Sequence, residues 1–199
     1  MNFSFSCFWR PGTGKTVTVV EAIRQLLAKN PEARILACAP SNSAADLIAQ
    51  KLLVLGATQL FRLNSASREY RSLPTDLRDF SLVNGDHIFS VPPLERMMTF
   101  RVIVSTCISG GMPYGIGMPR GHFNHIFIDE AGQAMEPEVM VPIKTMADGM
   151  TNTVFAGDIQ QLGPIVRSSV SMGLGLWRSY LARIMACDIY NLQEGKGLT

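Results

Sequence analysis

The sequence predicts an α/β fold in which a mostly parallel sheet carries helices on both faces. Short apolar runs without polar alternation recur along the chain, as in strands that are buried on both sides of a parallel sheet. These runs lie at 34–39, 101–106, 126–128 and 153–156. Helical patterns separate them, and polar motifs follow them. Because parallel strands end at one edge of a sheet, we expect the polar motifs to share that edge.

The first expected strand covers residues 3–7, where Phe3, Phe5 and Cys7 alternate with polar residues. A strand that leads into a phosphate-binding loop is usually an unbroken aliphatic run. We therefore interpret residues 1–10 as an atypical N-terminus that is truncated or wrongly joined.

A phosphate-binding loop is predicted at 11–16, where Pro-Gly-Thr-Gly-Lys-Thr precedes an apolar-periodic helix. In such a loop, backbone N–H groups, the lysine ammonium and the threonine hydroxyl hold the phosphates and Mg²⁺. The corresponding residues are Gly12, Thr13, Gly14, Lys15 and Thr16.

The loop departs from the complete pattern at its start. That pattern places its first glycine at position 9, where this chain has Trp9 followed by Arg10. Because the first glycine permits a sharp exit from the strand, we expect Trp9 to strain or displace the loop.

A polar segment follows the second strand and predicts a helix over 44–55. Ser43 and Asp46 have the spacing of a capping box, which accounts for the start of this helix. Ser41 and Asn42 remain, and their hydroxyl and amide groups could contact a nucleic-acid backbone. The expected apolar face of the helix consists of Leu47, Ile48, Leu52 and Leu55.

Residues 56–99 are the least informative, although 60–63 could form a short strand. Four arginines are scattered there among acidic residues: Arg62, Arg68, Arg71 and Arg78. We interpret them as a solvated, salt-bridged surface in preference to an RNA-facing patch. The histidines His87, His122 and His125 lack metal-ligand spacing and are interpreted as structural.

Two adjacent carboxylates, Asp129 and Glu130, follow the apolar run at 126–128. Carboxylates at the end of a buried strand are costly unless a positive group joins them, and Mg²⁺ is the usual partner. The alternative is a solvated acidic turn. Beyond this point we expect a helix over 137–146, a strand over 153–156 and an apolar core stripe formed by Leu176, Trp177, Tyr180, Leu181, Ile184 and Met185.

Composition places the chain among globular proteins. Its 199 residues suffice for one domain, with 47% apolar and 17% charged residues. A net charge of +2 is too small to indicate nucleic-acid binding by itself. Four widely spaced cysteines favour a reduced, intracellular protein with buried thiols. We find neither a membrane-spanning run nor a secretory signal pattern.

Four motifs stand in a fixed order, at 11–16, 39–46, 129–134 and 157–164. Together they resemble the first RecA-like domain of superfamily-1 helicases of the Upf-like group, and in particular the RNA-silencing helicases of the Armitage type. The resemblance covers about residues 11–190 as an ATP-binding domain. Residues 191–199 then resemble a truncated linker toward a second RecA-like domain, which this chain lacks.

The resemblance implies a RecA-like P-loop NTPase fold, with ATP and Mg²⁺ as ligands and single-stranded RNA as partner. It implies phosphate binding by the 12–16 loop and catalytic roles for Lys15, Glu130 and Gln161. Glu130 would activate water, while Gln161 would sense the γ-phosphate. It also implies Mg²⁺ binding by Thr16 and Asp129, and RNA contacts by Ser41, Asn42 and Thr106.

Three functions remain open from the sequence. The first is a fragment of a cytoplasmic, ATP-dependent RNA helicase that works with RNA-silencing proteins away from membranes. The second is a catalytically inactive nucleotide- or RNA-binding fragment, and the third is a P-loop DNA helicase. Because an arginine from the second domain contributes about 10³–10⁵ in rate in such motors, we expect the isolated chain to hydrolyse ATP very slowly.

Overall fold

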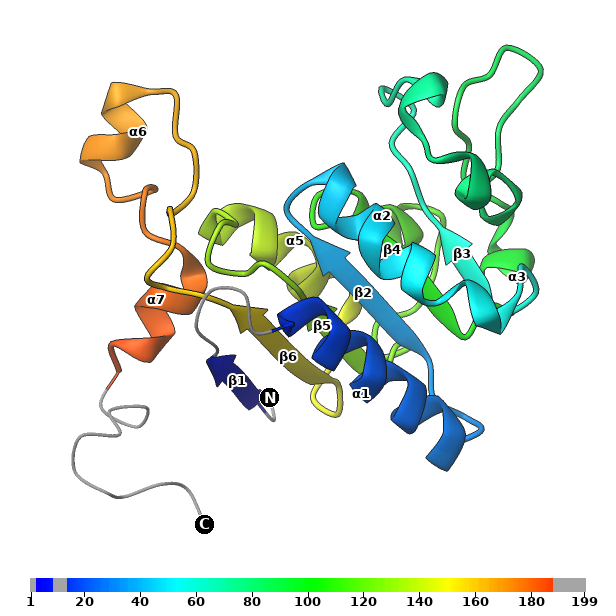
Figure 1. Cartoon of the computed structure of the whole chain (residues 1–199), viewed down its shortest axis with the longest axis horizontal. Coiled ribbons are helices and arrows are strands. Elements are labelled where there is room, and N and C mark those ends of the chain that lie inside the picture. The colour runs from blue at the N-terminus through cyan, green and yellow to red at the C-terminus, as the bar shows by residue number, and fades with distance from the viewer. Residues whose placement is uncertain (1–2, 9–13, 188–199) are drawn as a thin grey trace.

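The structure, a computed structural model, describes residues 3–8 (backbone) and 14–187. Six strands form one sheet in the order β1-β6-β5-β2-β4-β3, and all the neighbouring pairs are parallel (Figure 1). The strands are β1 (Phe3–Phe8), β2 (Ile35–Ala39), β3 (Leu60–Arg62), β4 (Val102–Thr106), β5 (His125–Ile128) and β6 (Asn152–Gly157). The predicted parallel sheet is confirmed.

Helices cover both faces of this sheet. Apolar side chains of α1 (Lys15–Lys29) and α2 (Asn42–Lys51) pack on one face, and those of α5 (Glu136–Met146) and α7 (Tyr180–Met185) pack on the other. The shorter helices are α3 (Leu94–Met97), α4 (Met112–Gly115) and α6 (Ser169–Gly173). The short 3₁₀ helices are η1 (Leu53–Leu55), η2 (Tyr70–Ser72), η3 (Thr75–Phe80) and η4 (Ser109–Gly111).

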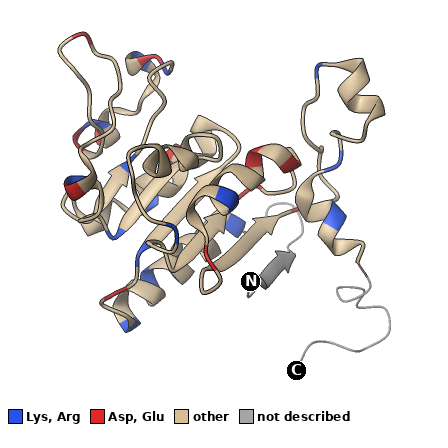
Figure 2. Ribbon diagram, turned by 180° about the vertical axis from the view of Figure 1, so that it is seen from behind, with Lys and Arg blue, Asp and Glu red and all other residues tan. Residues whose placement is uncertain are grey.

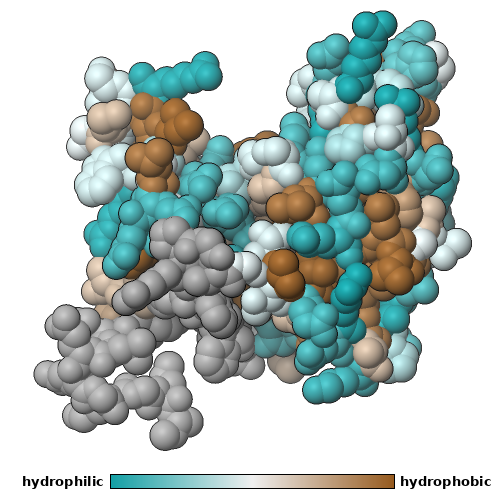
Figure 3. All heavy atoms as spheres, in the orientation of Figure 1, coloured by the Kyte–Doolittle hydropathy of each residue, from teal (hydrophilic) through white to brown (hydrophobic). Residues whose placement is uncertain are grey.

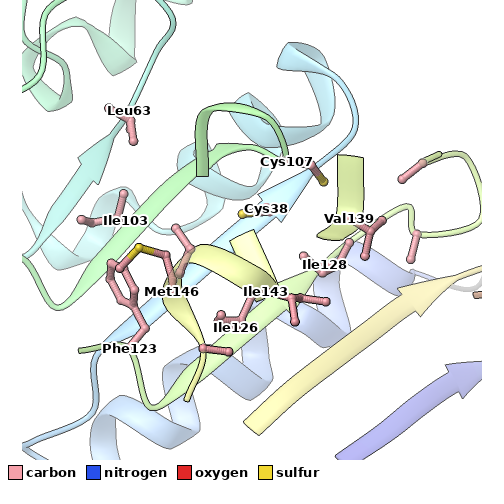
Figure 4. Packing of buried hydrophobic residues seen from close by; sticks show 14 of the residues in the cluster. Cys38, Leu63, Ile103, Cys107, Phe123, Ile126, Ile128, Val139, Ile143 and Met146 are labelled. Atoms are coloured by element: carbon pink, nitrogen blue, oxygen red, sulfur yellow. The ribbon is translucent and has the colours of Figure 1, made fainter. Parts of the chain in front are cut away.

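Strand β2 lies inside the sheet, between β5 and β4, and this position explains why its sequence is apolar throughout. Successive side chains of a strand point to opposite faces, and here both faces are buried. Ile35 and Ala37 belong to the core under α1 and α2, whereas Leu36 and Cys38 belong to the core under α5. Figure 4 shows the second of these cores, with Val139 of α5 among its side chains.

The helix after β2 differs from its prediction at both ends. It begins at Asn42 and ends at Lys51, and its N-cap is Ser41, whose Oγ accepts a hydrogen bond from the Ala44 N–H at 3.2 Å. The predicted capping box is wrong because the Asp46 carboxylate is bound to two arginines instead. Leu47, expected in the core, is 43% exposed.

The interpretation of the arginines at 62–78 as one solvated surface is wrong for two of them. Arg62 and Arg68 are buried and form ion pairs with Asp46, whereas Arg71 and Arg78 are exposed as expected. Figure 2 shows basic and acidic residues interspersed along the segment between β3 and β4, at the upper left of the view.

The apolar stripe expected near the C-terminal end is only partly in the core. Tyr180 and Leu181 are buried, but Trp177 precedes helix α7 and is 57% exposed. Apolar side chains also gather on the surface of α6, which stands away from the sheet at the upper left of Figure 3. The exposed large apolar residues on this helix and its end are Val170, Met172 and Leu174.

Two of the expected buried thiols, Cys38 and Cys107, are buried, while Cys187 is exposed. Burial raises the pKa of Cys38 to about 12, so this thiol stays protonated at neutral pH. Within the described part of the chain, none of the helices combines the length and the apolar character needed to cross a membrane.

Candidate active site

Three polar segments meet at the carboxyl edge of the sheet, as the sequence predicts. Lys15 and Thr16 begin helix α1, Asp129 and Glu130 follow β5, and Asp158 follows β6. Gly14, the N-cap of α1, has φ 79°, a left-handed conformation that glycine adopts without strain.

Two direct contacts join the start of α1 to the acidic residues. The Thr16 hydroxyl donates a hydrogen bond to Asp129 Oδ2 at 2.8 Å. Lys15 Nζ lies 3.9 Å from Asp158 Oδ2, and both side chains are buried. This distance is short enough for an ion pair but too long for a hydrogen bond. Asp158 Oδ2 has no hydrogen-bond partner among the described residues.

Glu130 occupies an unusual position beside these groups. Its φ of 51° is left-handed, a conformation that costs a non-glycine residue energy and is found often at functional sites. Burial, the adjacent Asp129 carboxylate and Asp158 raise the pKa of Glu130, against the opposing effect of Lys15. Burial also raises the pKa of Asp129, opposed mainly by the hydrogen bond from Thr16.

A pocket of about 310 Å³ opens at this edge of the sheet. It is lined by Gly14, Lys15, Thr16, Val17, Leu47, Lys51, Glu130 and Gln161. The structure therefore brings five of the predicted site residues around one cavity, with Asp129 bound to one of them, Thr16. Gly12, Thr13, Trp9 and Arg10 lie outside the described residues.

The two acidic loops are held together by close backbone contact. The Ala131 N–H donates to the Ala156 carbonyl at 2.8 Å. A Cβ at Gly132 would lie 2.3 Å from the Asp158 carbonyl oxygen, and one at Gly157 would lie 2.7 Å from the Gly132 nitrogen. Glycine at both positions lets Asp129 and Asp158 approach the same end of helix α1.

The predicted nucleic-acid residues lie at the same edge but outside the pocket. Ser41 and Asn42 follow β2 and are exposed, and Thr106 ends the neighbouring strand β4 in register with Ala39. The Thr106 hydroxyl donates to Ser109 Oγ at 3.1 Å. The structure thus brings these three residues to adjacent strand ends.

Sequence reasoning missed several residues at the site. It assigned no role to Asp158, although Asp158 follows a buried strand as Asp129 does. Val17, Leu47 and Lys51 also line the pocket, and no motif points to them because they reach it from helix faces.

The donor set fits Mg²⁺. One hydroxyl and one carboxylate, Thr16 and Asp129, already touch, and both are oxygen donors of the kind that Mg²⁺ prefers. Among the described residues no group of three or more His, Cys, Asp or Glu could enclose a metal. Mg²⁺ in nucleotide sites is usually bound through one or two protein oxygens, the nucleotide phosphates and water.

The raised pKa of Glu130 predicts a change in stability with pH. Since its folded-state pKa lies above the ordinary value, the folded chain loses stability as pH rises through the folded pKa. Glu130→Gln should therefore raise the melting temperature at about pH 7, and the gain should disappear below about pH 4. Thermal unfolding followed by circular dichroism measures both. The exposed Glu95→Gln is the control and should change neither; a lower melting temperature for Glu130→Gln at neutral pH would contradict the prediction.

Comparison with known proteins identifies the family. A family model described as an AAA domain matches residues 4–84 and 95–169. The putative helicase mov-10-B.1 of Danio rerio is 44% identical over 182 residues, which are 89% of this chain and 18% of that protein. The RNA helicase Mov10l1 of Homo sapiens is 42% identical over 190 residues (94% and 15%). The probable RNA helicase armi of Drosophila melanogaster is 34% identical over 210 residues (95% and 18%).

Among solved structures, a nuclease-deletion mutant of the Type ISP restriction-modification enzyme LlaGI, in complex with a DNA substrate mimic, matches 77% of this chain and 15% of its own. Its TM-score is 0.52 at 16% identity, a likeness of fold alone. The chain spans less than a fifth of the length of the relatives above. The chain belongs to the AAA-domain family and aligns with part of relatives that are named as helicases.

Proposed function

We propose that this chain is the ATP-binding motor domain of an ATP-dependent RNA helicase. ATP hydrolysis at the pocket would drive movement along single-stranded RNA. One observation carries the proposal: Lys15 and Thr16 of the phosphate-binding helix meet Glu130 and Gln161 around one pocket, with Asp129 bound to Thr16. The helix N-terminus adds its positive dipole to the phosphate site.

Phosphoryl transfer needs little covalent help from a protein, so each residue acts by position and charge. Thr16 and Asp129 would hold Mg²⁺, which neutralises phosphate charge when bound. Lys15, now 3.9 Å from Asp158, would turn its ammonium toward the β- and γ-phosphate oxygens. Asp158 would keep this ammonium at the pocket wall.

Glu130 would accept the proton of the attacking water. A general base works best when its pKa approaches the operating pH, and burial shifts the pKa of Glu130 in that direction. Gln161 lines the same pocket and would respond to the γ-phosphate. Both residues belong to loops at the ends of strands, where a rigid sheet positions mobile groups.

The residues that line the pocket favour slow ATP hydrolysis when this chain acts alone. Its cationic lining consists of Lys15 and Lys51, with no arginine among the described residues that line it. We infer that a second RecA-like domain supplies the arginine. Such an arginine contributes about 10³–10⁵ in rate.

RNA is the proposed strand because the relatives at 42% and 34% identity are named RNA helicases. We also propose that the protein acts in the cytoplasm together with RNA-silencing proteins. A DNA helicase would differ at the 2′-hydroxyl contacts. Competition between RNA and DNA of one sequence separates the two, and a tighter complex with DNA would exclude the RNA assignment.

The nucleotide site is tested by Lys15→Ala in the 199-residue chain. Loss of a charge-assisted contact to phosphate should weaken Mg-ATP binding by about 10- to 100-fold. Isothermal titration calorimetry measures this, with the exposed Lys144→Ala on α5 as the matched control, for which we expect unchanged affinity. Equal affinity of Lys15→Ala and the unmodified chain would exclude this site.

A further inference from the structure

The exposed residue Asn42, the first of helix α2, is held by a buried arginine. Its side-chain oxygen accepts a hydrogen bond from Arg62 Nη2 at 3.1 Å. A guanidinium has donors and no acceptor, so the amide atom that faces it must be Oδ1. The Nδ2 group of Asn42 therefore points away from Arg62, with two N–H donors to offer.

Arg62 is fixed on every side. It is fully buried, its Nε donates to Asp46 Oδ1 at 2.9 Å, and its Nη1 donates to the Leu63 carbonyl at 2.6 Å. These bonds go to helix α2 and to the residue that follows strand β3, so the guanidinium cannot rotate without breaking one. The orientation of the Asn42 amide is set by this anchored group.

The same cluster carries an excess of positive charge. Arg68 also binds Asp46, with Nη1 2.9 Å from Oδ1 and Nη2 2.6 Å from Oδ2. One carboxylate thus faces two guanidinium groups, which leaves one positive charge uncompensated within the cluster. Burial lowers the pKa of Arg62 to about 10, against the opposing effect of Asp46, so it remains charged at neutral pH.

We propose that Arg62 is a positioning residue that presents the Asn42 amide as a hydrogen-bond donor to a phosphodiester oxygen of a single-stranded nucleic acid. The inference rests on the nucleic-acid contact proposed for Asn42. A fixed donor in front of a buried positive charge suits an anionic acceptor. Such a contact holds the strand in place and reads no base, as phosphate contacts do.

The neighbouring cap residue strengthens this assignment. Ser41 Oγ accepts from the Ala44 N–H and lies 3.0 Å from Ser43 Oγ, a contact in which either hydroxyl can be the donor, so Ser41 offers one O–H donor at most. The Asn42 Nδ2 group makes no such hydrogen bond among the described residues. Asn42 therefore offers more N–H or O–H donors than Ser41 does.

The experiment compares Arg62→Lys with Arg68→Lys in the 199-residue chain, using fluorescence anisotropy with a labelled single-stranded oligouridine. Both changes keep the charge and remove a guanidinium that donates to Asp46, but only Arg62 donates to Asn42. We expect Asn42→Ala to weaken binding about tenfold and Arg62→Lys about fivefold, as for a charged hydrogen bond. Arg68→Lys should stay within about twofold.

A double-mutant cycle separates positioning from general stability. If Arg62 acts through Asn42, Arg62→Lys should have no further effect on affinity in an Asn42→Ala chain. Additive losses, or equal losses for Arg62→Lys and Arg68→Lys, would overturn the inference and leave the Asn42 contact standing. Unchanged binding by Asn42→Ala would remove that contact and the inference with it, while the nucleotide site is judged separately by Lys15→Ala.

Should Arg62→Lys fail to fold, Asn42→Asp provides a second test. This change keeps an oxygen on Arg62 and improves the ion pair, but it removes the amide donor. We expect a chain that is at least as stable and that binds the oligouridine at least tenfold more weakly. Binding equal to that of the unmodified chain would overturn the inference.

Discussion

Replacement of Asp46 by alanine should lower the free energy of unfolding by about 3–5 kcal/mol, because it leaves buried charge uncompensated. Asp46 accepts hydrogen bonds from Arg62 and Arg68, and all three residues are buried. Without the carboxylate, two guanidinium groups would face each other at low dielectric. Since domains of this size are stable by about 5–15 kcal/mol, urea denaturation should show a large shift of the midpoint.

The matched control is Asp76→Ala. Asp76 is exposed, and its carboxylate oxygens accept hydrogen bonds from Gln50 Nε2 at 3.0 and 3.2 Å. Like the buried cluster, this contact joins α2 to the segment that follows β3. An exposed contact of this kind contributes little, so we expect a change within about 0.5 kcal/mol. Similar losses in the free energy of unfolding for Asp46→Ala and Asp76→Ala would show that the buried cluster contributes no more to stability than the exposed contact does.

The sheet could be predicted because burial on both faces leaves a plain trace in sequence. Strand β2 needs an apolar residue at every position, and so does β5 from Ile126 to Ile128. The meeting of Lys15, Thr16, Asp129 and Glu130 followed from the same prediction, since parallel strands end at one edge.

The arginine cluster could not be predicted, because its cause lies in a pairing across the fold. Arg62 ends a short strand and stands between the apolar residues Phe61 and Leu63, and a charge there is stable only if a partner reaches it. That partner, Asp46, lies 16 positions earlier in a helix. In sequence the same aspartate has the spacing of a cap, and local spacing cannot distinguish the two roles.

The structural reason for the loop glycines of the site could not be predicted from the sequence either. Gly132 belongs to a motif that the sequence singles out, but the reason for glycine there is the distance to another loop. Only the packing of the loops after β5 and β6 shows that a side chain at Gly132 would meet the backbone of Asp158. Motif matching finds such a residue without explaining it.

Gly132→Ala should lower the free energy of unfolding by about 3 kcal/mol, at the upper end of the cost of overpacking. Its Cβ would lie 2.3 Å from the carbonyl oxygen of Asp158 and 3.0 Å from the carbonyl carbon. These are backbone atoms, so no side-chain rotation relieves the clash. The loops must separate, which moves Asp158 away from Lys15 and should also weaken Mg-ATP binding.

Gly149→Ala is the control, because nothing lies within 4 Å of its added Cβ and the residue is exposed. Chemical denaturation should place this variant within about 0.5 kcal/mol of the unmodified chain. Calorimetry with Mg-ATP then reads the site directly. If Gly132→Ala matched Gly149→Ala in both stability and affinity, the two loops would have room to part freely. Close contact between them would then not be what holds Asp158 beside Lys15.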